Sequence, residues 1–133
     1  MTKYLALHDA IFNGILLDGK HSCVLHFTHE DGSTCVVSLN GLRELLLNEF
    51  RQGNIVSEFQ IVSGEAVPSN IDPRRLFVAP HASADETYHA KFRAFCDARI
   101  AAIESGALTL VEITSVSCDY GADLIAICEE VRL

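Results

Sequence analysis

The chain has 133 residues and a formal net charge of −8, with 49% apolar and 21% charged side chains. This apolar content excludes a disordered chain, and the length suits one globular domain over residues 1–133 that buries roughly two-thirds of its unfolded surface. The acidic excess argues against nucleic-acid binding, which needs clustered Lys and Arg, and no apolar run approaches the ~20 residues of a membrane span.

The first predicted elements form a three-stranded antiparallel meander. Residues 8–17 are a strand, and Asp18-Gly19 turns the chain into a hairpin. A two-residue turn there would place Phe12 opposite Leu25, which is the register we prefer. A three-residue turn would place Asn13 opposite Leu25 instead.

The hairpin that follows has a predicted register. A three-residue loop, Glu30-Asp31-Gly32, would put Gly32 in the left-handed conformation that suits glycine. We choose this loop because it makes one face of the hairpin uniformly apolar. The pairs it predicts are Phe27 with Cys35, Leu25 with Val37 and Cys23 with Leu39.

The other face of this hairpin is the predicted partner-binding surface, unless a helix covers it. It mixes apolar and polar side chains, as protein interfaces do. Its residues are Val24, His26, Thr28, Thr34, Val36 and Ser38.

The middle of the chain is predicted as a short helix, a strand and a long connection. Helical spacing of leucines indicates a helix over 42–51, and 54–62 is a strand with Ile55, Phe59 and Ile61 on one face. The connection, 63–83, holds all three prolines, with a short edge strand at 76–78. A binding loop or cleft is a hypothesis for this connection.

The last third is predicted as a long helix, a strand and an undecided segment. Ser83 at the N-cap and Glu86 begin the helix, and Gly106 ends it. Residues 107–116 are a strand, whereas 122–133 fits either a helix or a strand. The apolar stripe of the helix comprises Tyr88, Phe92, Phe95, Cys96, Ile100 and Ile103.

Together these elements predict an α+β fold: a mostly antiparallel sheet of about five strands, packed with one short and one long helix. We expect no cofactor and no metal. His26 and His29 would point to opposite faces of a strand, and a glycine-rich phosphate loop is lacking. Arg74-Arg75 could clamp an anion on a partner, although an internal salt bridge is simpler.

Cys118 lies in a predicted turn after a strand and is the one candidate nucleophile. The other thiols fit small buried residues in a reducing compartment, because five cysteines without paired spacing form no disulfide framework. The N-terminus lacks the apolar core of a secretory signal. We therefore expect a cytoplasmic protein.

Three functions are compatible with these residues. The first is a non-enzymatic module that binds another protein, such as an acidic inhibitor of a basic toxin or nuclease; in general type this resembles small bacterial immunity proteins, with which the chain shares no motif. The second is a small enzyme or ligand-binding protein that uses Cys118 or a cleft beside 63–83. The third is a self-associating structural subunit. We favour the first.

Overall fold

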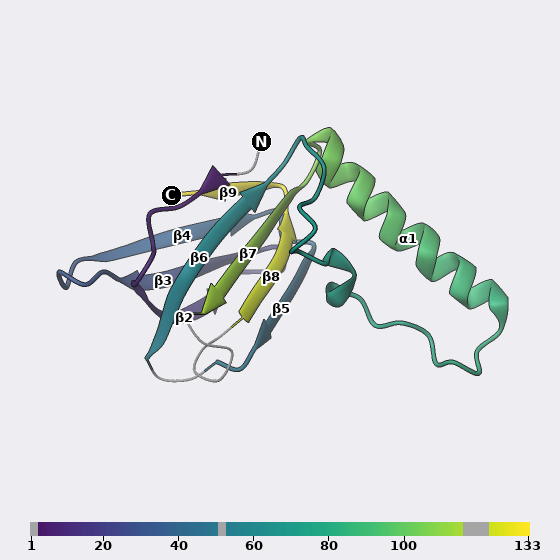
Figure 1. Ribbon diagram of the computed structural model, residues 1–133, viewed down its shortest axis with the longest axis horizontal. Helices are drawn as coiled ribbons and strands as arrows, with labels where there is room; N and C mark the ends of the chain where they lie inside the picture. The colour runs from purple at the N-terminus through teal and green to yellow at the C-terminus, as the bar shows by residue number, and fades with distance from the viewer. Residues whose placement is uncertain (1–2, 51–52, 116–122) are drawn as a thin grey trace.

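The computed structural model describes residues 3–50, 53–115 and 123–133, which form one antiparallel sheet of nine strands with a single α-helix (Figure 1). The strand order is β5-β8-β7-β6-β2-β3-β4-β9, and β1 pairs with β6. The predicted α+β fold of about five strands with a short and a long helix is therefore wrong. The elements are β1 (Lys3–Tyr4), β2 (Ile11–Leu17), β3 (Ser22–Thr28), β4 (Thr34–Asn40), β5 (Glu44–Asn48), β6 (Asn54–Val62), the 3-10 helix η1 (Pro73–Leu76), α1 (Glu86–Ser105), β7 (Thr109–Ser115), β8 (Asp123–Cys128) and β9 (Glu130–Arg132).

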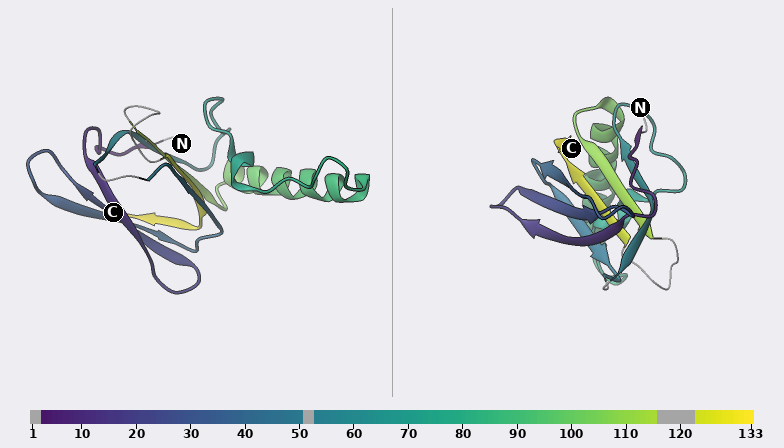
Figure 2. Two further views of the ribbon diagram at one scale, coloured as in Figure 1. Left: turned by 90° about the horizontal axis from the view of Figure 1, so that it is seen from below. Right: turned by 90° about the vertical axis from the view of Figure 1, so that its left-hand side faces the viewer.

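The sheet curls so that its two halves face each other (Figure 2). On one side β6 belongs to both halves, because it pairs with β7 and, at its beginning, with β2. On the other side β4 continues into β5 around Gly41, and β8 continues into β9 around Glu129. Gly41 has a φ of +63°, and an added Cβ would lie 2.5 Å from the Glu129 side chain, so this corner requires glycine.

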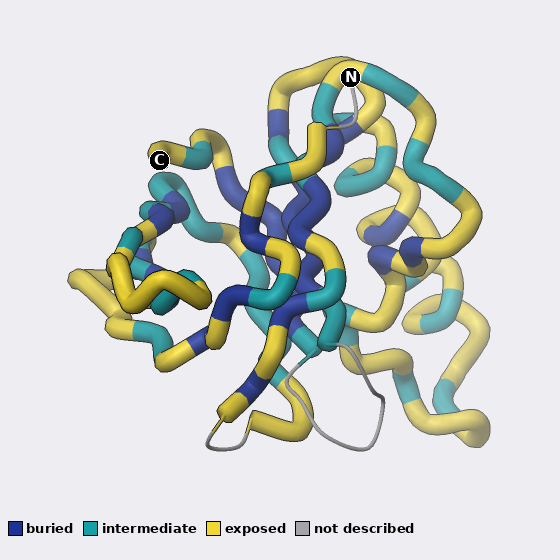
Figure 3. Tube along the Cα trace, turned by 60° about the vertical axis from the view of Figure 1, so that its left-hand side comes forward, coloured by how far each residue is buried: buried dark blue, intermediate teal, exposed yellow. Residues whose placement is uncertain are grey.

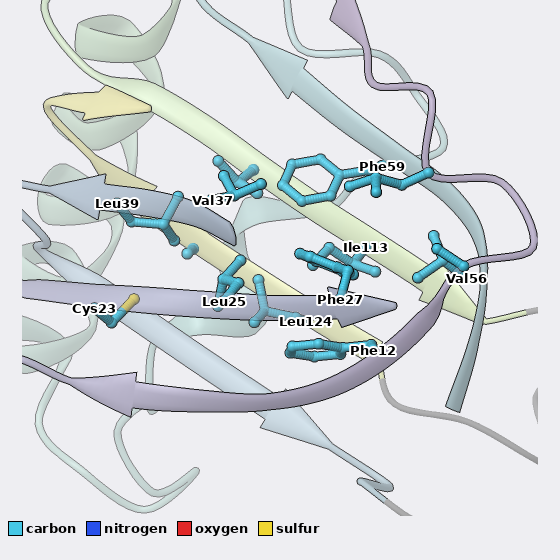
Figure 4. Close-up of a cluster of buried hydrophobic side chains, with 14 of the residues drawn as sticks. Phe12, Cys23, Leu25, Phe27, Val37, Leu39, Val56, Phe59, Ile113 and Leu124 are labelled. Carbon is cyan, nitrogen blue, oxygen red and sulfur yellow. The ribbon is translucent and has the colours of Figure 1, made fainter. Parts of the chain in front are cut away.

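The main core lies between the two halves (Figure 4). Phe12 of β2 stacks on Phe27 of β3 with ring centroids 5.2 Å apart, and the Phe59 ring of β6 lies 5.9 Å from that of Phe27. Burial of each such side chain contributes ~1.5–3 kcal/mol, so this core is the main source of stability. Its other buried members include Cys23, Leu25, Val37, Leu39, Val56, Val111, Ile113, Leu124, Ala126 and Cys128.

The predicted register of the β3–β4 hairpin is confirmed, including all three apolar pairs. The His29 N–H donates to the Ser33 carbonyl at 2.7 Å, which leaves the three-residue loop 30–32. Gly32 has a φ of +87°, as its predicted left-handed position requires. The register was predictable because only this one buries a whole face.

The register predicted between β2 and β3 is wrong. Phe12 pairs with Phe27 and not with Leu25, because the loop has three residues, 19–21, and begins one residue later than predicted, and because the register shifts between Phe12 and Gly14. Gly14, a glycine within the strand, lies at this bulge and is a local signal of it that the prediction did not use.

Strand β5 occupies the stretch that was predicted as a short helix. Leu45 and Leu47 pack into the main core, whereas Leu46 lies on the opposite side in a second apolar cluster. A strand buried on both faces reads as a continuous apolar run, which also satisfies helical spacing. Tertiary burial therefore explains the error.

The undecided C-terminal segment forms strands β8 and β9. All residues of β8 from Leu124 to Cys128 are buried, so it too lacks alternation. Glu129 is excluded from both strands at the corner, where its carboxylate pairs with Arg43 at 2.6 Å. In one continuous strand over 122–133, alternation would place Glu129 on the same face as Ile127 and Val131, and the break at the corner avoids this.

The connection between β6 and α1 covers the outer side of β5, β8, β7 and β6. Its regular structure is the single turn η1, and the predicted edge strand at 76–78 does not form. Together with the C-terminal turn of α1 it encloses the second apolar cluster, which comprises Val62, Ile71, Ile103, Leu108, Leu110, Ile125 and Ile127. We refer to this surface of the sheet as the covered face.

Helix α1 has the predicted extent, and Gly106 ends it in the left-handed conformation. Asp85, not Ser83, is the N-cap, since its carboxylate accepts from the Thr87 N–H at 3.1 Å. The helix projects away from the strands and is mostly exposed (Figures 2 and 3); only Cys96 and Ile103 are buried. No helix of the described ranges is long and apolar enough to cross a membrane.

Candidate partner-binding surface

The outward side chains of β2, β3 and β4, with one residue of β6, form a surface that neither α1 nor the connection covers (Figures 2 and 3). Among its large apolar side chains, Leu16 is 61% exposed and Val36 47% exposed. We call this surface the open face. It comprises Ile11, Leu16, Val24, His26, Thr28, Thr34, Val36, Ser38 and Ile55.

The structure brings the six hairpin residues of the predicted surface together on this face. His26 lies at its centre, opposite Val36 of β4 on one side and Gly14 of β2 on the other. An added Cβ on Gly14 would meet nothing within 4 Å, so the surface beside His26 is not filled from β2. Val24 pairs with Ser38, and Thr28 pairs with Thr34.

Sequence reasoning missed the apolar contribution of the neighbouring strands. Leu16 lies opposite Val24, and Ile11 lies opposite Thr28 and Ile55. Ile55 was predicted to share the face of Phe59, but a register shift between Val56 and Glu58 turns it outward, where it is 43% exposed. The two bulges hid these residues from a simple alternation rule.

Acidic side chains lie at the tip of the same hairpin. Glu30 and Asp31 are both exposed. The Ser33 hydroxyl and the Ser33 N–H donate to the Asp31 carboxylate at 2.6 and 2.9 Å, and these hydrogen bonds lower the pKa of Asp31. A negative charge is therefore fixed beside the open face.

Arg74 and Arg75, the other predicted partner-binding residues, lie in η1, which packs on the covered face. Arg74 pairs with Asp97 of α1 at 3.0 Å, and Arg75 pairs with Asp123 of β8 at 2.6 Å. The structure therefore separates them from the open face. Both guanidinium groups have the internal acidic partners that the simpler interpretation predicted.

A buried carboxyl lies beneath η1. Glu112 of β7 is 4% exposed and pairs with Gln60 of β6 and Ile125 of β8. The pKa of Glu112 is raised to about 7, mainly by burial and also by the charge of Asp123, whereas Arg75 opposes the rise. A carboxyl of this kind titrates near neutral pH.

Cys118, the candidate nucleophile, lies outside the described residues. The described cysteines are free thiols: three are buried, and Cys35 is half-buried. Burial raises the pKa of Cys23 to about 11 and that of Cys128 to about 12, so these two thiols stay protonated and unreactive at neutral pH. Within the described ranges, no three His, Cys, Asp or Glu side chains are grouped so as to hold a metal ion.

Comparison of the chain with protein-family models, curated proteins and solved structures finds no match.

Proposed function

We propose that this protein is a non-enzymatic binding module whose open face docks on a basic protein, acting as a cytoplasmic inhibitor of the immunity type. The observation that carries the proposal is an apolar-polar sheet face that neither the connection nor the 20-residue helix α1 covers. Monomeric proteins rarely expose contiguous apolar patches without a binding role.

Charge supports a basic partner. The net charge is −8, and Glu30 and Asp31 border the open face. Opposite charge on a partner speeds and orients association, and charged rims around an apolar centre are common in such interfaces. A toxin domain that binds nucleic acid has the required positive surface.

The test compares two single substitutions at the surface, one of the half-buried Val24 and one of the exposed Tyr88. Val24→Glu places a charge in the open face, and Tyr88→Glu, on the 61% exposed Tyr88 of α1, is the matched control. Wild type and both variants are used to capture proteins from the source cells, and each captured protein is then purified and its dissociation constant measured against salt.

The proposal expects a basic protein that binds wild type and Tyr88→Glu equally and loses about tenfold or more in affinity for Val24→Glu. Its affinity should weaken as salt is raised from about 50 to about 500 mM, because salt screens the exposed charge contacts across the interface. Equal capture by Val24→Glu and wild type would contradict the proposal. A dimer of the protein itself that Val24→Glu dissociates would instead support self-association.

A further inference from the structure

One edge of β4 is left unpaired over half its length. β3 pairs with β4 from Thr34 to Asn40, but β9 pairs with it only from Ser38 to Asn40. Among the described strands none lies on the second side of residues 34–37. Because an open strand edge presents unpaired N–H and C=O groups, it is a template for another strand.

The hydrogen bonds of the hairpin identify which backbone groups face this edge. In an antiparallel pair, the N–H and C=O of one residue point to the same neighbour, and successive residues alternate. The His29 N–H bonds the Ser33 carbonyl, so the hydrogen-bonded partners of β3 in this register include Cys35 and Val37. Thr34 and Val36 therefore direct their N–H and C=O groups to the open edge.

An apolar cavity adjoins the same edge. It has a volume of about 320 Å³ and separates β4 from the segment that links β1 to β2. Its lining is mostly apolar and includes Leu5, Leu7, Cys35, Val37 and Leu133. The cavity is therefore large enough to accept an apolar side chain from a strand that lies along β4.

We propose that the edge of β4 at Thr34–Val36 binds an extended segment of the partner by strand addition, with one of its apolar side chains in this cavity. The backbone donors and acceptors supply the affinity of such a mode, and the cavity supplies the selectivity. This inference rests on the proposed function, since it names how the partner of the open face is held.

The orientation of the segment follows from β9. Leu133 follows β9 at the border of the cavity, so a segment antiparallel to β4 would lie in line with β9 and leave past Thr34. It would then reach the acidic tip at Glu30 and Asp31. We therefore expect Lys or Arg at its carboxyl end, in agreement with a basic partner.

A second copy of the chain suits this edge less well than a peptide. Antiparallel pairing of two β4 edges would direct the 29–33 loop of one copy toward β9 of the other, because β9 occupies the edge beyond Val37. The net charge of −8 on each copy further opposes this approach.

The experiment uses a random library of linear twelve-residue peptides displayed on phage, selected on the full chain. Selected peptides are synthesised, and their dissociation constants are measured for wild type, Val36→Pro and Val36→Thr. Proline removes the outward N–H of residue 36, a substitution that an open strand edge tolerates, whereas threonine keeps that N–H. Amide hydrogen exchange of Thr34 and Val36 is recorded with and without peptide.

The inference expects peptides with alternating apolar residues and a basic carboxyl end, bound about tenfold more weakly by Val36→Pro and within about twofold by Val36→Thr. In the free protein the amide of Val36 should exchange faster than that of Val37, and peptide should slow it. Failure to select any peptide, or binding that Val36→Pro leaves unchanged, would overturn it. If Val36→Pro does not fold, the exchange measurement on wild type decides the question.

Failure of this inference is distinguishable from failure of the proposed function. A captured partner that is lost with Val24→Glu but retained with Val36→Pro would leave the open face as the binding surface and remove strand addition. A partner retained by both variants would contradict both the proposed function and strand addition.

Discussion

The two outer sides of this curled sheet differ in a way that a sheet alone does not require. Over β5, β8, β7 and β6, the connection and the end of α1 enclose a second apolar cluster. Over β2, β3 and β4, the outward residues of the open face are exposed or half-buried, and Leu16 and Val36 are among the exposed ones. The connection thus packs on one side of the sheet only.

This difference in coverage indicates that apolar residues have different roles on the two sides. On the covered face an apolar side chain contributes to folding, and a polar one such as Glu112 must be accommodated at a cost. On the open face an apolar side chain contributes little to folding, so its presence requires another reason. The following measurements test this contrast.

The largest contrast in stability is expected between two aspartate variants, one on each side of the sheet. Leu110→Asp, at a position that is 0% exposed, buries an unpaired charge and should lower the free energy of unfolding by at least about 4 kcal/mol, or prevent folding. Val24→Asp should change it by less than about 1 kcal/mol. Chemical denaturation measures both, and similar losses for the two variants would abolish the distinction between the faces.

Replacement of the buried carboxyl should stabilise the protein. The unfolded chain releases the proton of Glu112 near its ordinary pKa of 4.5, whereas the folded chain holds it to about 7. The stability from protonated Glu112 is therefore complete below pH 4.5 and is lost as pH rises through 7. Glu112→Gln should then be more stable than wild type at pH 8, by roughly 3 kcal/mol.

Thermal unfolding of Glu112→Gln and wild type at pH 4.5, 6 and 8 checks this prediction. The difference in stability should grow as pH rises between the two pKa values. A variant that is less stable at pH 8 would show that ionised Glu112 is stabilised by its neighbours.

A smaller effect is expected from the ion pair that holds η1. Arg75 and Asp123 are 37% and 34% exposed at their side chains, so Arg75→Ala should cost no more than about 1 kcal/mol. Because Arg75 opposes the pKa rise of Glu112, its removal should raise that pKa further. NMR titration of the Glu112 carboxyl in Arg75→Ala measures this pKa. An unchanged or lower pKa than in wild type would contradict an interaction between Arg75 and Glu112.

The smallest effect is expected at the apolar margin of the open face. Leu16→Ser, at a 61% exposed position, should change the free energy of unfolding by less than about 0.5 kcal/mol. The variant Ile15→Ser is its neighbour with a side chain that packs against the main core, and it should cost more. Equal denaturation midpoints for Leu16→Ser and Ile15→Ser would show that Leu16 contributes to stability as much as Ile15, and would contradict this prediction.

Local chemistry made part of this fold predictable from the sequence. Gly32 and the alternation from Cys23 to Leu39 determined the hairpin register, and Gly106 determined the end of α1, whereas its N-cap was predicted at Ser83 and is Asp85. Long-range burial determined the rest. β8 is buried and β5 is partly buried on both faces, which removes the alternation that distinguishes a strand from a helix.

The candidate surface followed the same division. Six of its residues were predicted because they alternate with the apolar face of one hairpin, whereas Leu16 and Ile55 lie next to bulges that simple alternation does not predict. Arg74 and Arg75 were separated from it because their partners, Asp97 and Asp123, come from distant segments. The positions of α1 and the connection, neither of which covers the open face, are set by distant parts of the described chain and are not encoded in the hairpin.

Amide hydrogen exchange of the protein, alone and with the partner that wild type captures, tests the central claim most directly. The account predicts slower exchange in β3 and β4, Ser22–Thr28 and Thr34–Asn40, and unchanged exchange in α1, Glu86–Ser105. Slowing confined to α1 or to the 63–85 connection would contradict the claim that the open face binds the partner.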